Sequence, residues 1–171
     1  MYDYSGTVEP VTAAVDPDLD PLALEQQACF ALAVTNRAVL AVYRPLLEPL
    51  GLTHPQYLVM LAMWDHHRST PDNRAPLSVK QIATALQLDS ATLSPMLKRL
   101  ETLGLLTRAR SAADERATDV ELTDAGLALR SRALAIPAAV VTRLGVDLAE
   151  LEELRRVLTH INSAALAAGT L

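Results

Sequence analysis

The sequence predicts a mainly helical protein with one small β-hairpin, and three observations lead to this fold class. Alanine and leucine are abundant in a chain of 171 residues that is 50% hydrophobic and only 4% aromatic, which favours helix over sheet. Residues 78–126 show the order of two short helices, a hairpin with a polar tip and a new helix. Both ends of the chain carry apolar residues at helical spacing. Together they predict a winged helix-turn-helix with long terminal helices.

The N-terminal region is expected to begin with a disordered acidic tail over residues 1–20, because it holds several Asp and Glu residues and two prolines without an apolar period. Asp20 followed by Pro21 suits a helix start. The first helix is therefore expected from about Pro21 to Tyr43, broken by Pro45 and Pro49. We assign residues 21–52 to an N-terminal dimerisation helix and turn.

A second helix is predicted from the capping box Thr53-x-x-Gln56 through Trp64. A polar loop should follow over residues 65–76, and it contains His66 and His67. Adjacent histidines without a third ligand at helical spacing are more often solvated than metal-bound, so we predict no metal and no cofactor. We assign residues 53–126 to the DNA-binding lobe.

The helix-turn-helix begins at the capping box Ser78-x-x-Gln81, turns at residues 87–89, and continues from about Asp89 to Leu103, where Gly104 ends it. Base edges are usually read near the N-terminus of the second helix, and cations further along reach phosphates. The helix has few bidentate readers of guanine, so DNA shape should matter. The outward-facing candidates for DNA binding are Ser90, Ala91, Thr92, Ser94, Pro95, Lys98 and Arg99. Pro95 costs no backbone hydrogen bond only if the helix begins near Thr92, a start that the sequence leaves open.

The wing is predicted from two strands, Leu105 to Arg110 and Ala117 to Leu122, joined by six polar or small residues. Its DNA-binding candidates are Arg108, Arg110 and Arg116. We expect Arg116 to enter the minor groove. The alternative is that it pairs with Asp114 to support the wing, and both roles can coexist.

The C-terminal region, residues 127–171, is predicted to hold dimerisation helices. Thr123 can cap a helix that begins at Asp124 and kinks at Pro137. The last helix, from about Asp147 to Ala168, carries an apolar stripe at alternating steps of three and four: Leu151, Leu154, Leu158, Ile161 and Ala165. Such a stripe requires a partner helix, either within its own domain or in a second copy. We favour a homodimer, which also suits palindromic DNA.

Charge and composition limit the class of protein. The net charge of −5 argues against a protein that coats nucleic acid, yet residues 78–116 carry six Lys or Arg against four Asp or Glu. A single cysteine fits a reducing cytoplasm. We find no secretory signal and no apolar stretch of the ~20 residues that a membrane span needs, so a cytoplasmic protein without a membrane partner is expected. No acid-base or phosphate-binding constellation indicates an enzyme.

With these motifs placed, the sequence resembles the MarR family of bacterial transcriptional regulators. The matching segments include Leu88-Asp89-Ser90, Thr92-Leu93, Pro95 to Glu101, Asp114-Glu115-Arg116 and Leu122-Thr123-x-x-Gly126. Upstream, the segments that look like the organic-hydroperoxide-sensing OhrR branch are Cys29 to Leu32, Tyr43 to Leu50 and Pro55 to Leu58. The resemblance implies a dimeric repressor that binds a pseudo-palindromic operator in double-stranded DNA and releases it when a cysteine of the first helix is oxidised.

On composition alone, Cys29 is a small buried hydrophobe. As a peroxide sensor it must be a thiolate, although an unperturbed thiol with a pKa of about 8.5 is only slightly ionised at neutral pH. The helix dipole fades within one turn, and we expect Cys29 in the second or third, so hydrogen-bond donors are needed. The family's donor corresponds to Tyr43. Fourteen helical residues, or about 21 Å, separate it from Cys29, so the partner subunit must supply it.

The chain departs from the OhrR pattern at His54, where the branch commonly has a second tyrosine donor. A neutral imidazole donates one hydrogen bond, and a protonated one would favour the thiolate more strongly and make sensing pH-dependent. Alternatively, His54 is only a surface residue of a first helical turn. Because Cys29 is the only cysteine, oxidation by an organic hydroperoxide would give a sulfenic acid that reacts with a small cellular thiol or overoxidises.

Two other classes of function compete with a redox repressor. The first is a MarR-type repressor gated by reversible binding of a small phenolic or lipophilic ligand, in which Trp64, Tyr57 and Tyr43 line a pocket and Cys29 only packs. The second is a dimeric interaction protein without DNA binding.

Overall fold

The computed structural model describes residues 20–169 except residues 21, 70–74, 112–113 and 115. The chain divides into two compact units, residues 1–37 and 38–171. The boundary falls within α1 (Ala28–Leu47). The expected division at residues 20, 52 and 126 stays a prediction. The acidic tail over residues 1–19 lies outside the described residues.

The first helix begins and ends later than expected. Leu24–Gln26 form a 3-10 turn and Gln27 is extended, so α1 begins at Ala28 rather than near Pro21, which itself lies outside the described residues. At its other end α1 continues past Pro45 to Leu47, because a proline in the last turn removes only one helical hydrogen bond.

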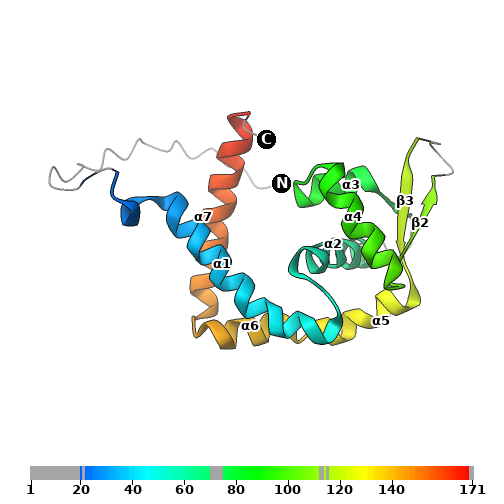
Figure 1. Ribbon diagram of the computed structural model, residues 1–171, viewed down its shortest axis with the longest axis horizontal. Coiled ribbons are helices and arrows are strands. Elements are labelled where there is room, and N and C mark those ends of the chain that lie inside the picture. The colour runs from blue at the N-terminus through cyan, green and yellow to red at the C-terminus, as the bar shows by residue number, and fades with distance from the viewer. Residues whose placement is uncertain (1–19, 21, 70–74, 112–113, 115, 170–171) are drawn as a thin grey trace. The chain divides into compact units, whose positions relative to one another are not determined.

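The second unit contains the remaining helices and a small sheet (Figure 1). Its elements are η2 (Glu48–Leu50), α2 (His54–Ser69), β1 (Leu77–Ser78), α3 (Val79–Leu86), α4 (Ser90–Thr102), β2 (Leu106–Arg110), β3 (Thr118–Leu122), α5 (Asp124–Ala133), α6 (Ile136–Leu144) and α7 (Leu148–Ala167).

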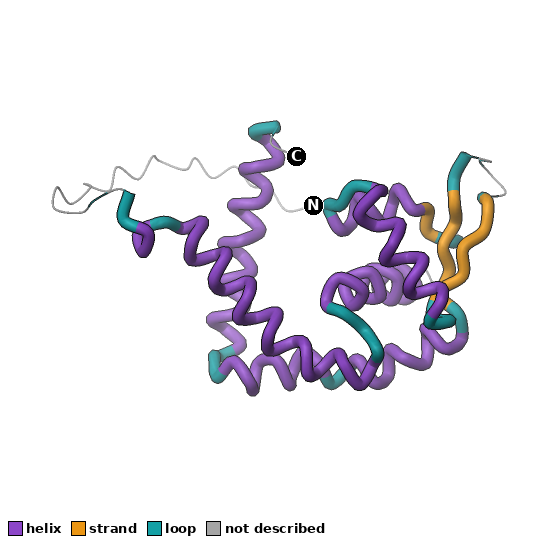
Figure 2. Tube along the Cα trace, viewed as in Figure 1, coloured by secondary structure: helices purple, strands orange, loops and turns teal. Residues whose placement is uncertain are grey.

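The predicted winged helix-turn-helix is confirmed, and its caps are those that the sequence indicates. Ser78 and Gln81 form the capping box of α3, and Gln87 turns the chain in the left-handed region with φ of 52°. The Thr123 side chain accepts a hydrogen bond from the Gly126 N–H at the start of α5. The strands form an antiparallel sheet in the order β1-β3-β2 (Figure 2). The two-residue β1 was not predicted, because two residues carry no detectable alternation.

Two further expectations are wrong. α2 continues through Ser69, so His66 and His67 lie in its last turn rather than in a loop, and His66 Nε2 lies 2.8 Å from the Ala75 carbonyl oxygen. Residues 70–74 of the expected loop lie outside the described residues. Pro137 does not kink one helix, because α5 ends at Ala133 and Pro137 stands in the first turn of a separate helix, α6.

The core lies among α2, α3, α4, the sheet and α5, with Ile136 and Val140 of α6. Leu93, Leu97 and Leu100 of α4 are fully buried, whereas Met96 is half-buried. By contrast, α7 buries none of its residues, and the side chains of its predicted stripe include Leu154 at 43% and Ile161 at 47% exposure. Within the part of the chain that the structure describes, most of the stripe is therefore exposed.

Two stretches, 28–50 and 124–144, are long and apolar enough by composition to cross a membrane, which corrects the expectation that none reaches this length. The second is divided into α5 and α6 and carries Arg130 and Arg132. The guanidinium of Arg132 donates a hydrogen bond to the Pro49 carbonyl, so this stretch packs against the segment that follows α1.

Candidate DNA-reading head and redox site

The recognition helix α4 begins at Ser90, and Asp89 caps it. The Asp89 carboxylate accepts hydrogen bonds from the Thr92 N–H at 2.7 Å and the Thr92 hydroxyl at 2.8 Å. These bonds lower the pKa of Asp89, so the cap is ionised at neutral pH. With this start, Pro95 lies inside the helix and leaves the Ala91 carbonyl without its usual helical partner, which answers the open question of the helix start.

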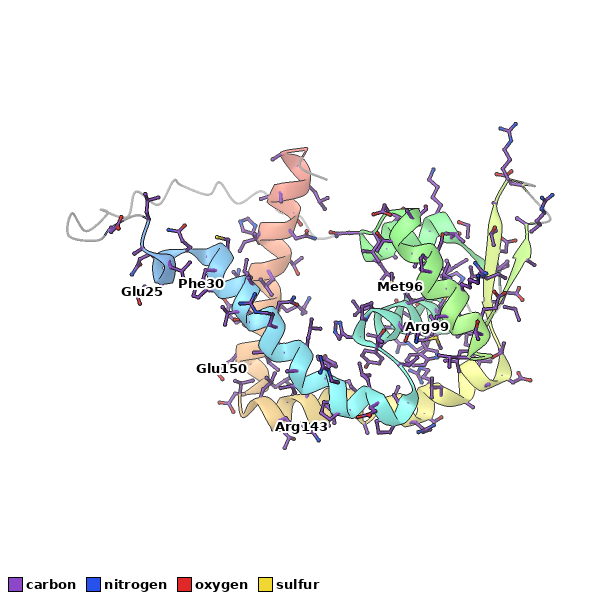
Figure 3. All side chains as sticks on the ribbon, in the orientation of Figure 1. Glu25, Phe30, Met96, Arg99, Arg143 and Glu150 are labelled. Atoms are coloured by element: carbon purple, nitrogen blue, oxygen red, sulfur yellow. The ribbon has the colours of Figure 1, made fainter. Side chains whose placement is uncertain are left out.

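The candidate readers on α4 are all exposed. Figure 3 labels one of them, Arg99. The Ser94 hydroxyl donates to the Ser90 carbonyl at 2.6 Å, and the Thr92 hydroxyl belongs to the cap. The exposed members are Ser90, Ala91, Thr92, Ser94, Pro95, Lys98 and Arg99. Their roles on DNA remain predictions.

Arg108 of the wing is held by a residue that sequence reasoning missed. Its Nε and Nη2 donate to Glu101 Oε2 at 3.0 and 2.7 Å. These hydrogen bonds lower the pKa of Glu101, so the carboxylate stays ionised. The pair fastens β2 to the end of α4. Seven residues across a helix end and a turn give no spacing rule from which it could be predicted.

At the wing tip, Asp114 acts on the backbone. Its carboxylate accepts a hydrogen bond from the Arg116 N–H at 2.9 Å, and its carbonyl accepts one from the Ala117 N–H at 2.8 Å. Among the residues that the structure describes, no ion pair holds the guanidinium of Arg116 or that of Arg110, and both residues are exposed. The wing can therefore present both cations outward while Asp114 shapes its turn.

Tyr43 and His54, the proposed hydrogen-bond donors to the cysteine sulfur, lie in contact with each other. Their ring centroids are 4.8 Å apart in an edge-on arrangement. Burial raises the pKa of Tyr43, so its phenol stays protonated and able to donate. Burial lowers the pKa of His54, which favours the neutral imidazole over the protonated one. An open groove lies beside His54, and its lining also includes Leu40 and Arg44.

Cys29 belongs to the other unit of the chain. It is exposed and is the second residue of α1, which corrects the expectation that it lies in the second or third turn. A side chain in the first turn lies where the helix dipole favours negative charge. Composition alone suggested that Cys29 is a small buried hydrophobe, and its exposure shows that this expectation is wrong.

A second concave feature bears on the ligand-gated alternative. A pocket of about 330 Å³ lies between α2 and the α5–α6 junction. Tyr57 and Trp64 line it as expected, with Arg68 and Arg130 as cations, whereas Tyr43 is not part of the lining.

Comparison with known proteins places these features in context. A family model described as "Transcriptional regulator SarA/Rot" matches residues 41–131. The organic hydroperoxide resistance transcriptional regulator of Bacillus subtilis (strain 168) is 41% identical over 136 residues, which are 78% of this chain and 87% of the relative.

Two similar solved structures are of AbfR from Staphylococcus epidermidis, each bound to DNA. The reduced form has a TM-score of 0.68 at 30% identity and covers 85% of this chain and 94% of the other. The overoxidised form has a TM-score of 0.60 at 33% identity and covers 81% and 95%.

Proposed function

This chain belongs to the MarR family of transcriptional regulators, in the branch of the organic hydroperoxide regulator, and from that membership we propose that it is a dimeric, cytoplasmic DNA-binding repressor. We propose further that it leaves its operator when an organic hydroperoxide oxidises Cys29. The observation that carries the redox part is the pairing of Tyr43 with His54, at 4.8 Å, beside an open groove. These rings offer two neutral donors, and the cysteine that they would serve is exposed on the first turn of α1.

The donors would come from the partner subunit. Cys29 and Tyr43 are separated by fourteen residues of α1, or about 21 Å of helix, far beyond hydrogen-bond reach. In a dimer with a twofold axis, Cys29 of each copy can lie beside Tyr43 and His54 of the other copy. The complete site would then exist only in the dimer. Oxidation would then act on the interface that determines the spacing of the two DNA-reading heads.

The chemistry is a two-electron oxidation of sulfur. The Cys29 thiolate attacks the terminal oxygen of the hydroperoxide, the O–O bond breaks, and the departing alkoxide takes up a proton to leave as the alcohol. Sulfur becomes a sulfenic acid while the peroxide is reduced. A small cellular thiol then condenses with the sulfenic acid to give a mixed disulfide and water, or further peroxide oxidises the sulfur irreversibly.

The proposal is tested by fluorescence anisotropy of the protein on labelled DNA from its own promoter region, with an organic hydroperoxide added in the presence of a small thiol. We expect release from DNA for the native chain and retention for Cys29→Ser. AbfR has been solved on DNA in an overoxidised form, so the affinity of each oxidation state should be measured separately, with mass spectrometry of Cys29. Release of Cys29→Ser at the same peroxide concentration would exclude Cys29 as the sensor.

The pocket lined by Tyr57, Trp64 and two arginines supports a second candidate, a repressor gated by a small aromatic or lipophilic acid. Its volume of about 330 Å³ lies at the lower end of the range for small-molecule sites. This candidate predicts DNA release by a ligand such as salicylate at constant redox state, with Cys29→Ser releasing as readily as the native chain.

A further inference from the structure

Trp64 makes a long-range contact that neither DNA reading nor sulfur chemistry requires. Its side chain is only 4% exposed, and its indole Nε1–H donates to the Gly126 carbonyl at 2.9 Å, sixty-two residues along the chain. This buried hydrogen bond is costly to break, because the indole N–H is then left without an acceptor. It is also easy to observe, since Trp64 is the only tryptophan in the sequence.

The acceptor lies where the recognition helix and the wing meet. A Cβ atom at Gly126 would lie 2.2 Å from the Leu105 carbonyl oxygen, so the first turn of α5 presses directly on the backbone that leads into β2. Thr123 reinforces this contact, because its N–H donates to the Leu105 carbonyl at 3.1 Å and its hydroxyl to the Gly104 carbonyl at 2.6 Å. Movement of Gly126 would therefore move the end of α4 and the base of the wing together.

On its other side, Trp64 continues the aromatic cluster of the candidate redox site. Its ring centroid lies 6.4 Å from that of Tyr57, and Tyr57 lies 6.1 Å from Tyr43, which contacts His54. All three spacings fall within the range of interacting aromatic pairs. A continuous row of rings therefore runs from His54 and Tyr43, the candidate hydrogen-bond donors, to the hydrogen bond between Trp64 and Gly126.

We propose that Trp64 is the positioning residue through which the state of the redox site reaches the DNA-reading head. The inference rests on the proposed redox function and adds its route. With Cys29 reduced, the contacting rings hold the indole so that it donates to Gly126 and fixes the base of the wing. When oxidation displaces Tyr43, Tyr57 and Trp64 shift with it, the hydrogen bond opens, and the end of α4 and the wing lose their DNA-binding position.

The first test is the emission of Trp64 in the full-length protein without DNA. Addition of an organic hydroperoxide should shift the emission of the native chain to longer wavelength as the indole leaves its buried hydrogen bond, and should leave Cys29→Ser unchanged. Tyr57→Leu, which interrupts the row of rings, should lose the shift while mass spectrometry still finds Cys29 oxidised. An unchanged emission of the native chain after complete oxidation of Cys29 would overturn the inference.

The second test measures DNA affinity in both redox states. Trp64→Phe keeps a ring but removes the donor, so the reduced variant should bind DNA about three- to tenfold more weakly, and the ratio of reduced to oxidised affinity should shrink by the same factor. Ile82→Val is the matched control, because it destabilises the same core while every ring and the Trp64 donor stay in the chain. Its ratio should equal that of the native chain. A ratio in Trp64→Phe equal to the native one would reduce Trp64 to a packing residue.

The two levels of proposal fail differently. If peroxide does not release the native chain from DNA, the redox function itself is wrong. If the native chain is released and Cys29→Ser is not, while Trp64 emission and the Trp64→Phe ratio stay unchanged, the redox function stands and only the route through Trp64 is wrong.

Discussion

The DNA-reading head and the α7 helix differ in how much of their structure one chain can complete. In the head, Leu93, Leu97 and Leu100 of α4 are fully buried, and each helix start is capped by a side chain of the same segment. In α7, no residue is buried, although its apolar stripe is as regular as that of any core helix. The head therefore completes its own core, whereas the described residues leave the apolar surface of α7 exposed, as a dimerisation helix requires.

This difference separates reading from sensing. The groups that we expect to face DNA are positioned within one chain, by Asp89, Glu101 and Asp114. The proposed sensor is instead divided, with Cys29 in one unit of the chain and its donors in the other. A regulator built this way can keep its head intact while the subunit interface carries the signal.

Disruption of the α7 stripe should have the largest effect. Leu158→Asp places a charge on a side chain that is 37% exposed in one chain, so the monomer should fold, but the dimer should not form. Loss of the second half-site contact should weaken DNA binding by about 100-fold or more. Ser163→Asp, on the opposite face of the same helix, is the control for charge alone. Analytical ultracentrifugation with DNA titration decides, and a dimeric Leu158→Asp would contradict the assignment of the interface.

Gly126→Ala should damage the head and leave the dimer intact. The new Cβ would meet the Leu105 backbone oxygen at 2.2 Å, and backbone cannot move aside as a flexible side chain can. We expect the free energy of unfolding to fall by about 1–3 kcal/mol. Gly145→Ala, where no atom lies within 4 Å, should lose only the cost of a left-handed backbone, about 1 kcal/mol. Urea denaturation of both variants measures the difference, and equal losses would show that the contact at Gly126 can relax.

Within the wing, Arg116→Ala and Arg108→Ala should separate DNA contact from support. The Arg116 side chain has no ion-pair partner in the described part of the chain, so its loss should lower DNA affinity by at least about fivefold without a change in melting temperature. Arg108→Ala should lower the melting temperature slightly, because Glu101 loses its partner. Melting curves and anisotropy on the two variants provide the answer. The reverse pattern would exchange the two roles.

The smallest expected effect is a pH dependence of stability at His54. Burial lowers its pKa in the folded chain, so the unfolded chain binds the proton more readily as the pH falls through about 6.5. The contribution of His54 to stability is therefore full above that pH and lost below it. His54→Phe keeps a ring and cannot titrate, so its stability should fall less between pH 7.5 and 5.5. An identical fall in both proteins would locate the titration elsewhere.

Local signals in the sequence were sufficient for the head. The capping box at Ser78 and the cap at Thr123 each depend on a residue three positions further along, and both occur as expected. The start of α1 and the length of α2 were missed because helix ends depend on packing as well as on caps.

Contacts that follow no period in the sequence were also missed. Three contacts join residues whose separation in sequence follows no period. They are the hydrogen bond from Trp64 to Gly126, the ion pair of Arg108 with Glu101, and the pairing of β1 with β3. The meeting of Tyr43 with His54 was expected from the family pattern, and no spacing rule in the residues themselves would have indicated it.

The pairing of Arg108 with Glu101 also affects how strongly the DNA affinity depends on salt concentration. DNA binding releases counterions condensed on the phosphates, and the steepness with which affinity falls as salt rises reflects the number of protein cations that replace them. Arg108 is already paired with the Glu101 carboxylate, so on DNA we expect it to displace fewer cations than an unpaired arginine would. Operator occupancy should therefore vary less with ionic strength than it would if all three wing arginines were unpaired.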